Sequence, residues 1–269
     1  MFSFVSFVVR DLFMSSLHVI DPNPSGKPPV LLLHGLGADS TSWSLQVPAL
    51  IQAGFRPVAP DAPGFGGSAY DGHGWNIRRV AAQMAGLLEE LQIGPVHVVG
   101  LSMGGTIAQQ FALDFPQLTK KLVLVSTFSV LRPDEFSGWA YFIRRVTSVV
   151  TMGQAAQAQM VAWRVFPHPN DQELREMFLA IVARADPRAY RRAMVALGLF
   201  NSTRRLREIR VPTLVITGAD DSTVRPARQR LLVQGIQGAK QVIIADAGHA
   251  VSVNQAEEFN QALVEFLKE

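Results

Sequence analysis

The 269-residue chain contains no cysteine, which excludes disulfides, thiol catalysis and any cysteine-ligated metal site. Long hydrophobic runs are also missing, since no apolar stretch approaches the roughly 20 residues that a membrane-spanning helix needs. Charge is nearly balanced, because 25 Lys and Arg against 22 Asp and Glu leave a formal net charge of +3. So small a surplus gives no reason to expect a nucleic-acid partner. No His-Glu-x-x-His or comparable metal-ligand spacing occurs, and we expect neither a metal nor a cofactor.

The first ten residues, MFSFVSFVVR, are apolar enough to be compared with a secretory signal peptide. The run is short, no basic residue precedes it, and no small-residue cleavage site follows cleanly. Alternation along residues 4–9 favours a first strand instead. We therefore expect a cytoplasmic protein and leave secretion open, because secreted bacterial enzymes can also lack cysteine.

Hydrophobic residues make up 48% of the chain, enough for one buried core. Short apolar runs alternate with patterns that have one apolar helical face. The expected strands cover residues 29–33, 55–61, 96–99, 122–125, 213–216 and 241–244, and the expected helices cover residues 80–91, 106–115 and 256–267. Alternation of this kind predicts an α/β fold, with a mostly parallel sheet covered by helices on both faces.

One block, residues 131–210, interrupts this alternation. It contains no convincing strand, only helical patterns separated by glycine and proline, and it is rich in large aromatic side chains. We interpret it as a helical cap, or lid, inserted into a core formed by residues 1–130 and 211–269. The alternative is that these helices only add an extra layer to the domain.

Ser102 stands within the sequence Gly100-Leu101-Ser102-Met103-Gly104, after an expected strand and before an expected helix. This G-x-S-x-G spacing is the nucleophile elbow, in which a strand turns sharply into a helix. Small neighbours let the two elements approach, and free N–H groups at the helix start favour negative charge beside the serine. A serine among glycines can also be an ordinary turn residue, but the strand and the helix around it favour a nucleophile.

A serine nucleophile needs a base, and the base needs an acid that orients it. His249 follows the last expected strand, and Asp220 and Asp221 follow the strand 213–216. Because the carboxyl ends of parallel strands meet at one edge of a sheet, we expect these side chains at the same edge as Ser102. The order serine, acid, histidine along the chain is also the order that accompanies the nucleophile elbow.

Two further motifs complete a family resemblance. Residues 34–37 match an HG-x-G oxyanion loop, with Trp43 following, and residues 61–68 match a D-x-P-G-x-G-x-S loop. With these motifs the chain resembles the α/β-hydrolase superfamily, in its small esterase and lactonase branch, over almost its whole length. The resemblance implies an α/β-hydrolase fold with an inserted helical cap.

The resemblance also implies which acid serves the histidine. In the family the acid commonly stands three residues after a glycine, here Gly218, which favours Asp221. Pro226 lies one position later than the usual pattern, so Asp220 is kept as an alternative. Asp246, although close to His249 in the sequence, is expected only to end a strand.

The remaining roles follow from the same resemblance. Ser102 is the expected nucleophile and His249 the expected base, while the backbone N–H groups of Leu36 and Met103 are expected to bind the oxyanion. His34 is interpreted as a structural brace for its loop.

These roles favour a hydrolase that cleaves carboxylic esters of small to medium apolar acyl groups through an acyl-enzyme intermediate. Its expected partner is a small-molecule ester, and a homodimer is left open. Apolar side chains expected to line the substrate pocket are Phe128, Phe142, Trp163, Val224 and Val251.

Other reactions on this fold remain alternatives. The serine argues against relatives with an aspartate nucleophile. A carbon–carbon bond hydrolase of the dienoate type is less favoured, because Ala250 stands where those enzymes tend to carry tryptophan. An enol-lactonase is closer, and a receptor that binds a small ligand with slow turnover is a further alternative.

Overall fold

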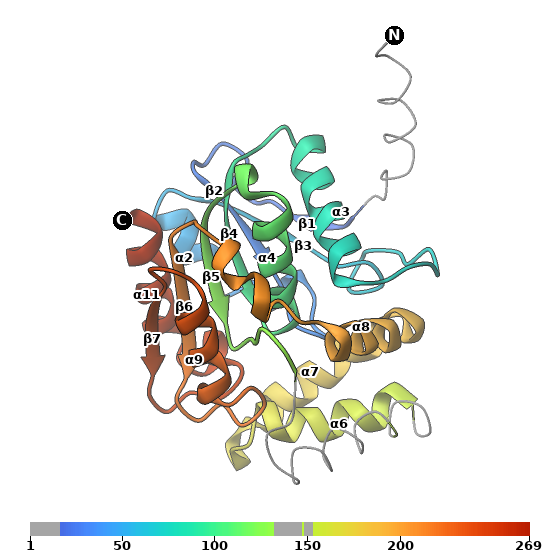
Figure 1. The fold of residues 1–269 in the computed structure, drawn as a ribbon. Helices are drawn as coiled ribbons and strands as arrows, with labels where there is room; N and C mark the ends of the chain where they lie inside the picture. The colour runs from blue at the N-terminus through green and yellow to red at the C-terminus, as the bar shows by residue number, and fades with distance from the viewer. Residues whose placement is uncertain (1–16, 132–146, 148–152) are drawn as a thin grey trace.

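The computed structural model describes residues 17–131, 147 and 153–269. In this part of the chain the strands form one seven-stranded sheet in the order β1-β3-β2-β4-β5-β6-β7, shown in Figure 1. Only β1 runs antiparallel to its neighbour, and every other pair is parallel. The strands are β1 Val19–Ile20, β2 Pro29–Leu33, β3 Arg56–Pro60, β4 Val96–Leu101, β5 Thr119–Val125, β6 Thr213–Gly218 and β7 Lys240–Ile244. The predicted α/β fold is confirmed, while the strand expected over residues 4–9 lies outside the described residues.

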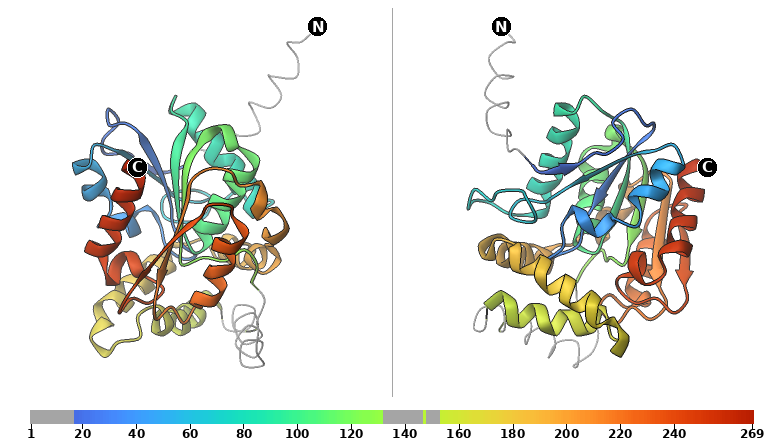
Figure 2. Two further views of the ribbon diagram at one scale, coloured as in Figure 1. Left: turned by 60° about the vertical axis from the view of Figure 1, so that its left-hand side comes forward. Right: turned by 180° about the vertical axis from the view of Figure 1, so that it is seen from behind.

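Helices cover both faces of the sheet, as the left view of Figure 2 shows. One face carries α3 (Ile77–Glu90), α4 (Met103–Asp114) and α9 (Pro226–Gly235), and the other carries α2 (Val47–Gln52) and α11 (Ala256–Lys268). Successive strand residues point to opposite faces. In β2, Leu31 and Leu33 therefore join the core under α3 and α4, whereas Val30 and Leu32 join the core under α11. Burial on both faces explains why these strands read as continuous apolar runs.

Three helices lie beyond the edge at which the parallel strands end, at the bottom of Figure 1. They are α6 (Gly153–Val165), α7 (Gln172–Arg184) and α8 (Pro187–Leu199), and we call them the outer helices. All three fall within the expected cap, but residues 132–146 and 148–152 of that segment lie outside the described residues. The division into a core and a cap therefore stays a prediction.

Short helices complete the connections. The 3-10 helices are η1 (Ser40–Trp43), η2 (Pro116–Leu118), η3 (Pro169–Asp171) and η4 (Thr203–Glu208), and α10 (Val251–Asn254) precedes α11. Asp39 caps η1, because its side chain accepts a hydrogen bond from the Thr41 N–H. This places a capped helical turn directly after the HG-x-G segment.

The imidazole of His97 in β4 is buried, and no hydrogen-bond partner of its Nδ1 is present among the described residues. Burial, and to a smaller extent the nearby charges of Lys121 and Lys120, lower the pKa of His97 from 6.5 to about 4. The unfolded chain therefore takes up this proton at a higher pH than the folded chain. As a result, the free energy of unfolding is fully retained above pH 6.5 and falls as the pH drops toward about 4.

We expect His97→Leu to flatten this pH dependence. Between about pH 7 and pH 5 the wild type should lose on the order of 1–2 kcal/mol more than the variant, because a buried leucine binds no proton. Urea unfolding at several pH values measures the difference, with His73→Gln, at an exposed loop position, as the control. Parallel stability curves for wild type and His97→Leu would contradict the prediction.

Candidate active site

Ser102 joins β4 to α4 in a backbone conformation that serine rarely adopts, with φ 54° and ψ −110°. A Cβ at position 100 would lie 2.7 Å from the Gly105 nitrogen, and one at position 104 would lie 2.7 Å from the His34 carbonyl oxygen. Only glycine fits at these two positions. The Ser102 N–H donates to the Val125 carbonyl at 2.9 Å, which fixes the turn to the neighbouring strand. The sequence motif thus folds as a tight strand-to-helix turn with Ser102 at its apex.

Asp221 and His249 meet on the loops that follow β6 and β7. The His249 Nδ1 lies 3.0 Å from Asp221 Oδ2 and 3.2 Å from Oδ1. The carboxylate also accepts hydrogen bonds from the Thr223 and Val224 N–H groups at 2.9 and 2.8 Å. Asp221 is buried, whereas Asp220 is exposed. Of the two acids considered from the sequence, Asp221 is the one that lies against the imidazole.

The structure therefore brings the acid and the histidine into direct contact. Among the residues it describes, no hydrogen bond joins the Ser102 hydroxyl to His249. The three residues follow β4, β6 and β7, whose parallel ends lie at one edge of the sheet. Catalytic hydrogen bonds are commonly long without substrate, so this geometry is compatible with a nucleophile and its base.

The HG-x-G loop lies beside Ser102, because a Cβ at position 35 would be 3.8 Å from the Ser102 Cβ. The N–H groups of Leu36 and Met103 donate to no acceptor in the described part of the chain. Met103 is the first residue of α4, where an N–H has no partner within the helix. Both N–H groups are thus available to bind a negatively charged oxygen.

Two hydrogen bonds fix the tautomer of the His34 ring and hold the HG-x-G loop in position. Its Nε2 accepts the Ala62 N–H at 3.0 Å, so the ring proton lies on Nδ1 and is donated to the Gly35 carbonyl at 2.8 Å. Burial lowers the pKa of His34, which keeps the ring neutral. These contacts support the interpretation of His34 as a brace between two loops.

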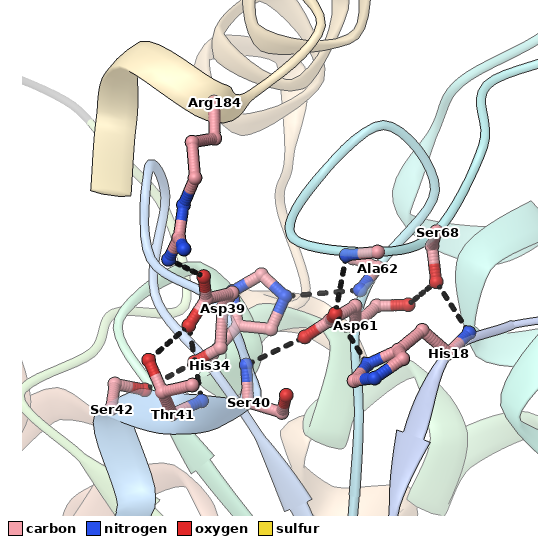
Figure 3. Close-up of polar contacts among 11 residues, drawn as sticks. His18, His34, Asp39, Ser40, Thr41, Ser42, Asp61, Ala62, Ser68 and Arg184 are labelled. Carbon is pink, nitrogen blue, oxygen red and sulfur yellow. Dashed lines mark hydrogen bonds and ion pairs between the residues drawn. The ribbon is translucent and has the colours of Figure 1, made fainter. Parts of the chain in front are cut away.

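Asp61 supports the same loop from the core, as Figure 3 shows. Its carboxylate accepts the Ser40 N–H at 2.6 Å and the Gly67 N–H at 2.8 Å, and His18 Nδ1 lies 2.9 Å away. Burial alone would raise the pKa of Asp61, but the hydrogen bonds from Gly67 and Ser40 outweigh it and lower the pKa. The D-x-P-G-x-G-x-S motif is therefore a structural support of the HG-x-G loop.

The outer helices and the residue before α8 contact three loops around the site. Arg184 of α7 forms an ion pair with Asp39 at 2.7 Å, seen at the upper left of Figure 3. Arg164 of α6 donates to the Ser222 carbonyl, next to Asp221, at 3.0 Å through Nε. The Asp186 N–H, just before α8, donates to the Gly64 carbonyl at 2.8 Å. Each outer helix thus contacts a loop that belongs to the site or supports it.

The residues expected to line the pocket differ in burial and in surroundings. Phe128 and Val224 are buried, and the Val224 N–H contacts Asp221. Phe142 lies outside the described residues. Trp163 is 60% exposed with the Arg175 guanidinium stacked 3.9 Å from its ring centre, and Val251 is fully buried in the core under α11. The assignment of these residues to a substrate pocket stays a prediction.

Sequence reasoning missed Gln229, whose amide also contacts Asp221. No motif marks it, since it stands in the polar N-terminal half of α9.

Across residues 17–131, 147 and 153–269, no cluster of three or more His, Cys, Asp or Glu side chains could hold a metal ion. Across the same residues, no helix is both long and apolar enough to cross a membrane.

Comparison with known proteins places this geometry among hydrolases. A family model described as "Alpha/beta hydrolase family" matches residues 30–262. A 2-hydroxy-6-oxononadienedioate/2-hydroxy-6-oxononatrienedioate hydrolase of Paraburkholderia xenovorans (strain LB400) is 31% identical, over 93% of this chain and 90% of its own. Among solved structures, the enol-lactonase from Burkholderia xenovorans LB400 has a TM-score of 0.85 at 27% identity, covering 94% of this chain and 96% of that one. A thermophilic esterase from Thermogutta terrifontis has a TM-score of 0.81 at 30% identity, covering 94% and 93%.

Proposed function

The chain belongs to the alpha/beta hydrolase family, and from this premise we propose that it is a carboxylic ester hydrolase with a serine nucleophile. The observation that carries the proposal is the backbone of Ser102, held at φ 54° between a strand and a helix start. A rare conformation of this kind persists only where the surrounding structure enforces it, and it is concentrated at functional sites. The proposed substrates are esters of small to medium apolar acyl groups.

In the proposed reaction the Ser102 Oγ attacks the ester carbonyl carbon while His249 Nε2 takes the hydroxyl proton. The carbonyl oxygen becomes an oxyanion, which the Leu36 and Met103 N–H groups stabilise. The imidazolium then gives its proton to the leaving alcohol, and the acyl group stays on Ser102. Water, activated by His249, attacks the acyl-enzyme and releases the acid. Asp221 stabilises the imidazolium throughout, because it accepts the Nδ1 proton.

Ester cleavage is favoured over carbon–carbon cleavage by the residue after the histidine, because Ala250 stands where carbon–carbon bond hydrolases of the dienoate type tend to carry tryptophan. Ala250 is buried, in a small apolar cluster with Val161, Val165 and Phe166 of the α6 region. The relative from Paraburkholderia xenovorans, a carbon–carbon bond hydrolase, is 31% identical, so this reaction is an outcome that experiment must test. The thermophilic esterase supports an ester substrate at a similar identity of 30%.

An enol-lactone is the second candidate substrate. It is favoured by the similarity to the enol-lactonase, with a TM-score of 0.85 over 94% of this chain. A lactone is a cyclic ester, so the same serine, histidine and oxyanion donors serve both reactions. A receptor with slow turnover is the third candidate, and fast multiple turnover would argue against it.

Steady-state hydrolysis of p-nitrophenyl esters from acetyl to dodecanoyl tests the proposal. We expect rapid multiple turnover with one clear optimum of chain length, because an apolar pocket binds the acyl chain that fills it best. The Ser102→Ala variant, purified in the same way, provides the background rate of hydrolysis. Activity on enol-lactones or dienoates, measured beside the esters, ranks the alternatives by kcat/KM.

If the wild type is as inactive as Ser102→Ala on every ester, the ester proposal is wrong. Turnover confined to lactones would replace it with the second candidate. Stabilisation by a small ligand, without multiple turnover of any of these compounds, would favour the receptor.

A further inference from the structure

The Asp221 carboxylate has an unequal set of hydrogen-bond donors. Backbone N–H groups of Thr223 and Val224 donate to Oδ1, and they belong to the same loop as the acid. Oδ2 faces the imidazole and receives one further donor, the Gln229 Nε2 at 3.1 Å. Apart from the imidazole, Gln229 is the one side chain in the described part of the chain that donates to Asp221.

Gln229 is held from three sides in a fully buried position in the first half of α9. Its Nε2 also donates to the Val224 carbonyl at 2.8 Å, and its Oε1 accepts the Thr217 hydroxyl at 2.9 Å. Thr217 in turn accepts a hydrogen bond from the Gln241 amide at 3.1 Å. Because Thr217 accepts from Gln241, its own proton is free for Gln229, which fixes the orientation of the Gln229 amide.

The result is a chain of hydrogen bonds that starts at the partly buried Gln241 on β7, crosses β6 and ends on the buried carboxylate. Rotation of a carboxylate about its last side-chain bond is soft, since that torsion has broad minima. Donors on Oδ1 alone would leave Oδ2 free to turn away from the imidazole. With Gln229 on Oδ2, the plane of the carboxylate is fixed at both oxygens.

We propose that Gln229 is a positioning residue, which holds Asp221 in the rotation that accepts the His249 Nδ1 proton and thereby keeps Nε2 free as the base. This inference rests on the proposed serine hydrolase reaction. Gln229 does not touch the substrate, and its effect passes through Asp221. It therefore changes the chemical step and not the binding of the ester.

Gln229→Leu removes the donor and replaces the amide side chain with an apolar one that still fills most of the buried space. Complete loss of a triad acid costs about 10⁴-fold in kcat, and we expect the loss of one of its supports to cost about tenfold. KM should change by less than about twofold, because Gln229 contacts Val224 only through the backbone carbonyl and the Val224 side chain is not replaced. The far-downfield proton NMR signal of the His249 Nδ1–H should shift or broaden, and this readout needs no substrate.

Gln109→Leu is the matched control. Gln109 is also fully buried, its Nε2 donates to two carbonyls, and its Oε1 accepts the Ser202 hydroxyl. It touches neither Asp221 nor His249. We expect a similar loss of stability in both variants, with kcat and the downfield proton signal retained only in Gln109→Leu.

Thr217→Val decides the case if Gln229→Leu does not fold. It removes the hydroxyl that orients the Gln229 amide, and we expect a loss of about threefold in kcat with KM unchanged. An unchanged kcat and an unchanged downfield signal in the folded variants would overturn the proposal, as would a rise in KM at constant kcat. Should the wild type cleave none of the substrates, the proposed reaction fails, and the proton signal alone still tests the positioning of His249.

Discussion

Ser102→Ala is expected to lower kcat by about 10⁵- to 10⁶-fold while leaving the protein folded. In the proposed reaction the hydroxyl oxygen forms the bond to the acyl group, and no other group replaces it. The remaining rate comes from the oxyanion donors and substrate binding, which the variant keeps. The hydroxyl makes no capping hydrogen bond to α4, and alanine bears the positive φ at a cost similar to that of serine. We therefore expect the free energy of unfolding to change by less than about 0.5 kcal/mol.

Three measurements check this expectation. Steady-state kinetics on the best p-nitrophenyl ester give kcat, and thermal unfolding gives the stability of the same preparation. A p-nitrophenyl phosphonate, which modifies nucleophilic serines, should release p-nitrophenolate and add the mass of its phosphonyl group to the peptide that contains Ser102 in the wild type only. A residual rate within about tenfold of the wild type would place the nucleophile on another residue.

The second large effect is expected at Gly104→Ala. A Cβ at this position would lie 2.5 Å from the Leu33 carbonyl carbon and 2.7 Å from the His34 carbonyl oxygen, both backbone atoms that cannot turn away. Either α4 or β2 must move, which displaces the Ser102 turn and the HG-x-G loop together. We expect a loss of about 3 kcal/mol or more, a fall in melting temperature of about 6 °C or more, and little remaining activity.

Gly86→Ala in α3 is the matched control for this substitution. A Cβ there meets no atom within 4 Å, so the helix gains from alanine and stability rises by roughly 0.5–1 kcal/mol. Thermal unfolding of the two variants measures the contrast. Equal melting temperatures would mean that α4 and β2 are not packed as closely as the structure shows.

The sequence motifs predicted the framework because they depend on local chemistry. Continuous apolar runs marked the buried parallel strands, and the confirmed α/β fold follows from their alternation with helices. The helix after Ser102 starts at Met103, three residues before the expected start, because glycines read as turn residues form the first turn of α4. The helix expected from residue 80 starts at Ile77, since Asn76 caps it.

The pocket assignments rest on residue type and position in the sequence, and neither of these determines the direction of a side chain. Val251 is close to His249 in the sequence, but it is the first residue of α10, and its side chain is buried in the core under α11. The expectation for Trp163 rests on its large aromatic side chain. The size of a side chain does not show which side of its helix, here α6, faces the site. Gln229 could not be found either, because its importance comes from a contact between α9 and a loop and from no motif.

The contacts of the outer helices bear on how this enzyme could be re-engineered. Arg184, Arg164 and the Asp186 N–H hold a carboxylate or a main-chain carbonyl of loops that carry or support the site. A chimera that takes α6, α7 and α8 from a homologue would lose these anchors. Grafts intended to change the proposed acyl preference should therefore retain Arg164, Arg184 and Asp186, so that the exchange does not also loosen the loops that these residues hold.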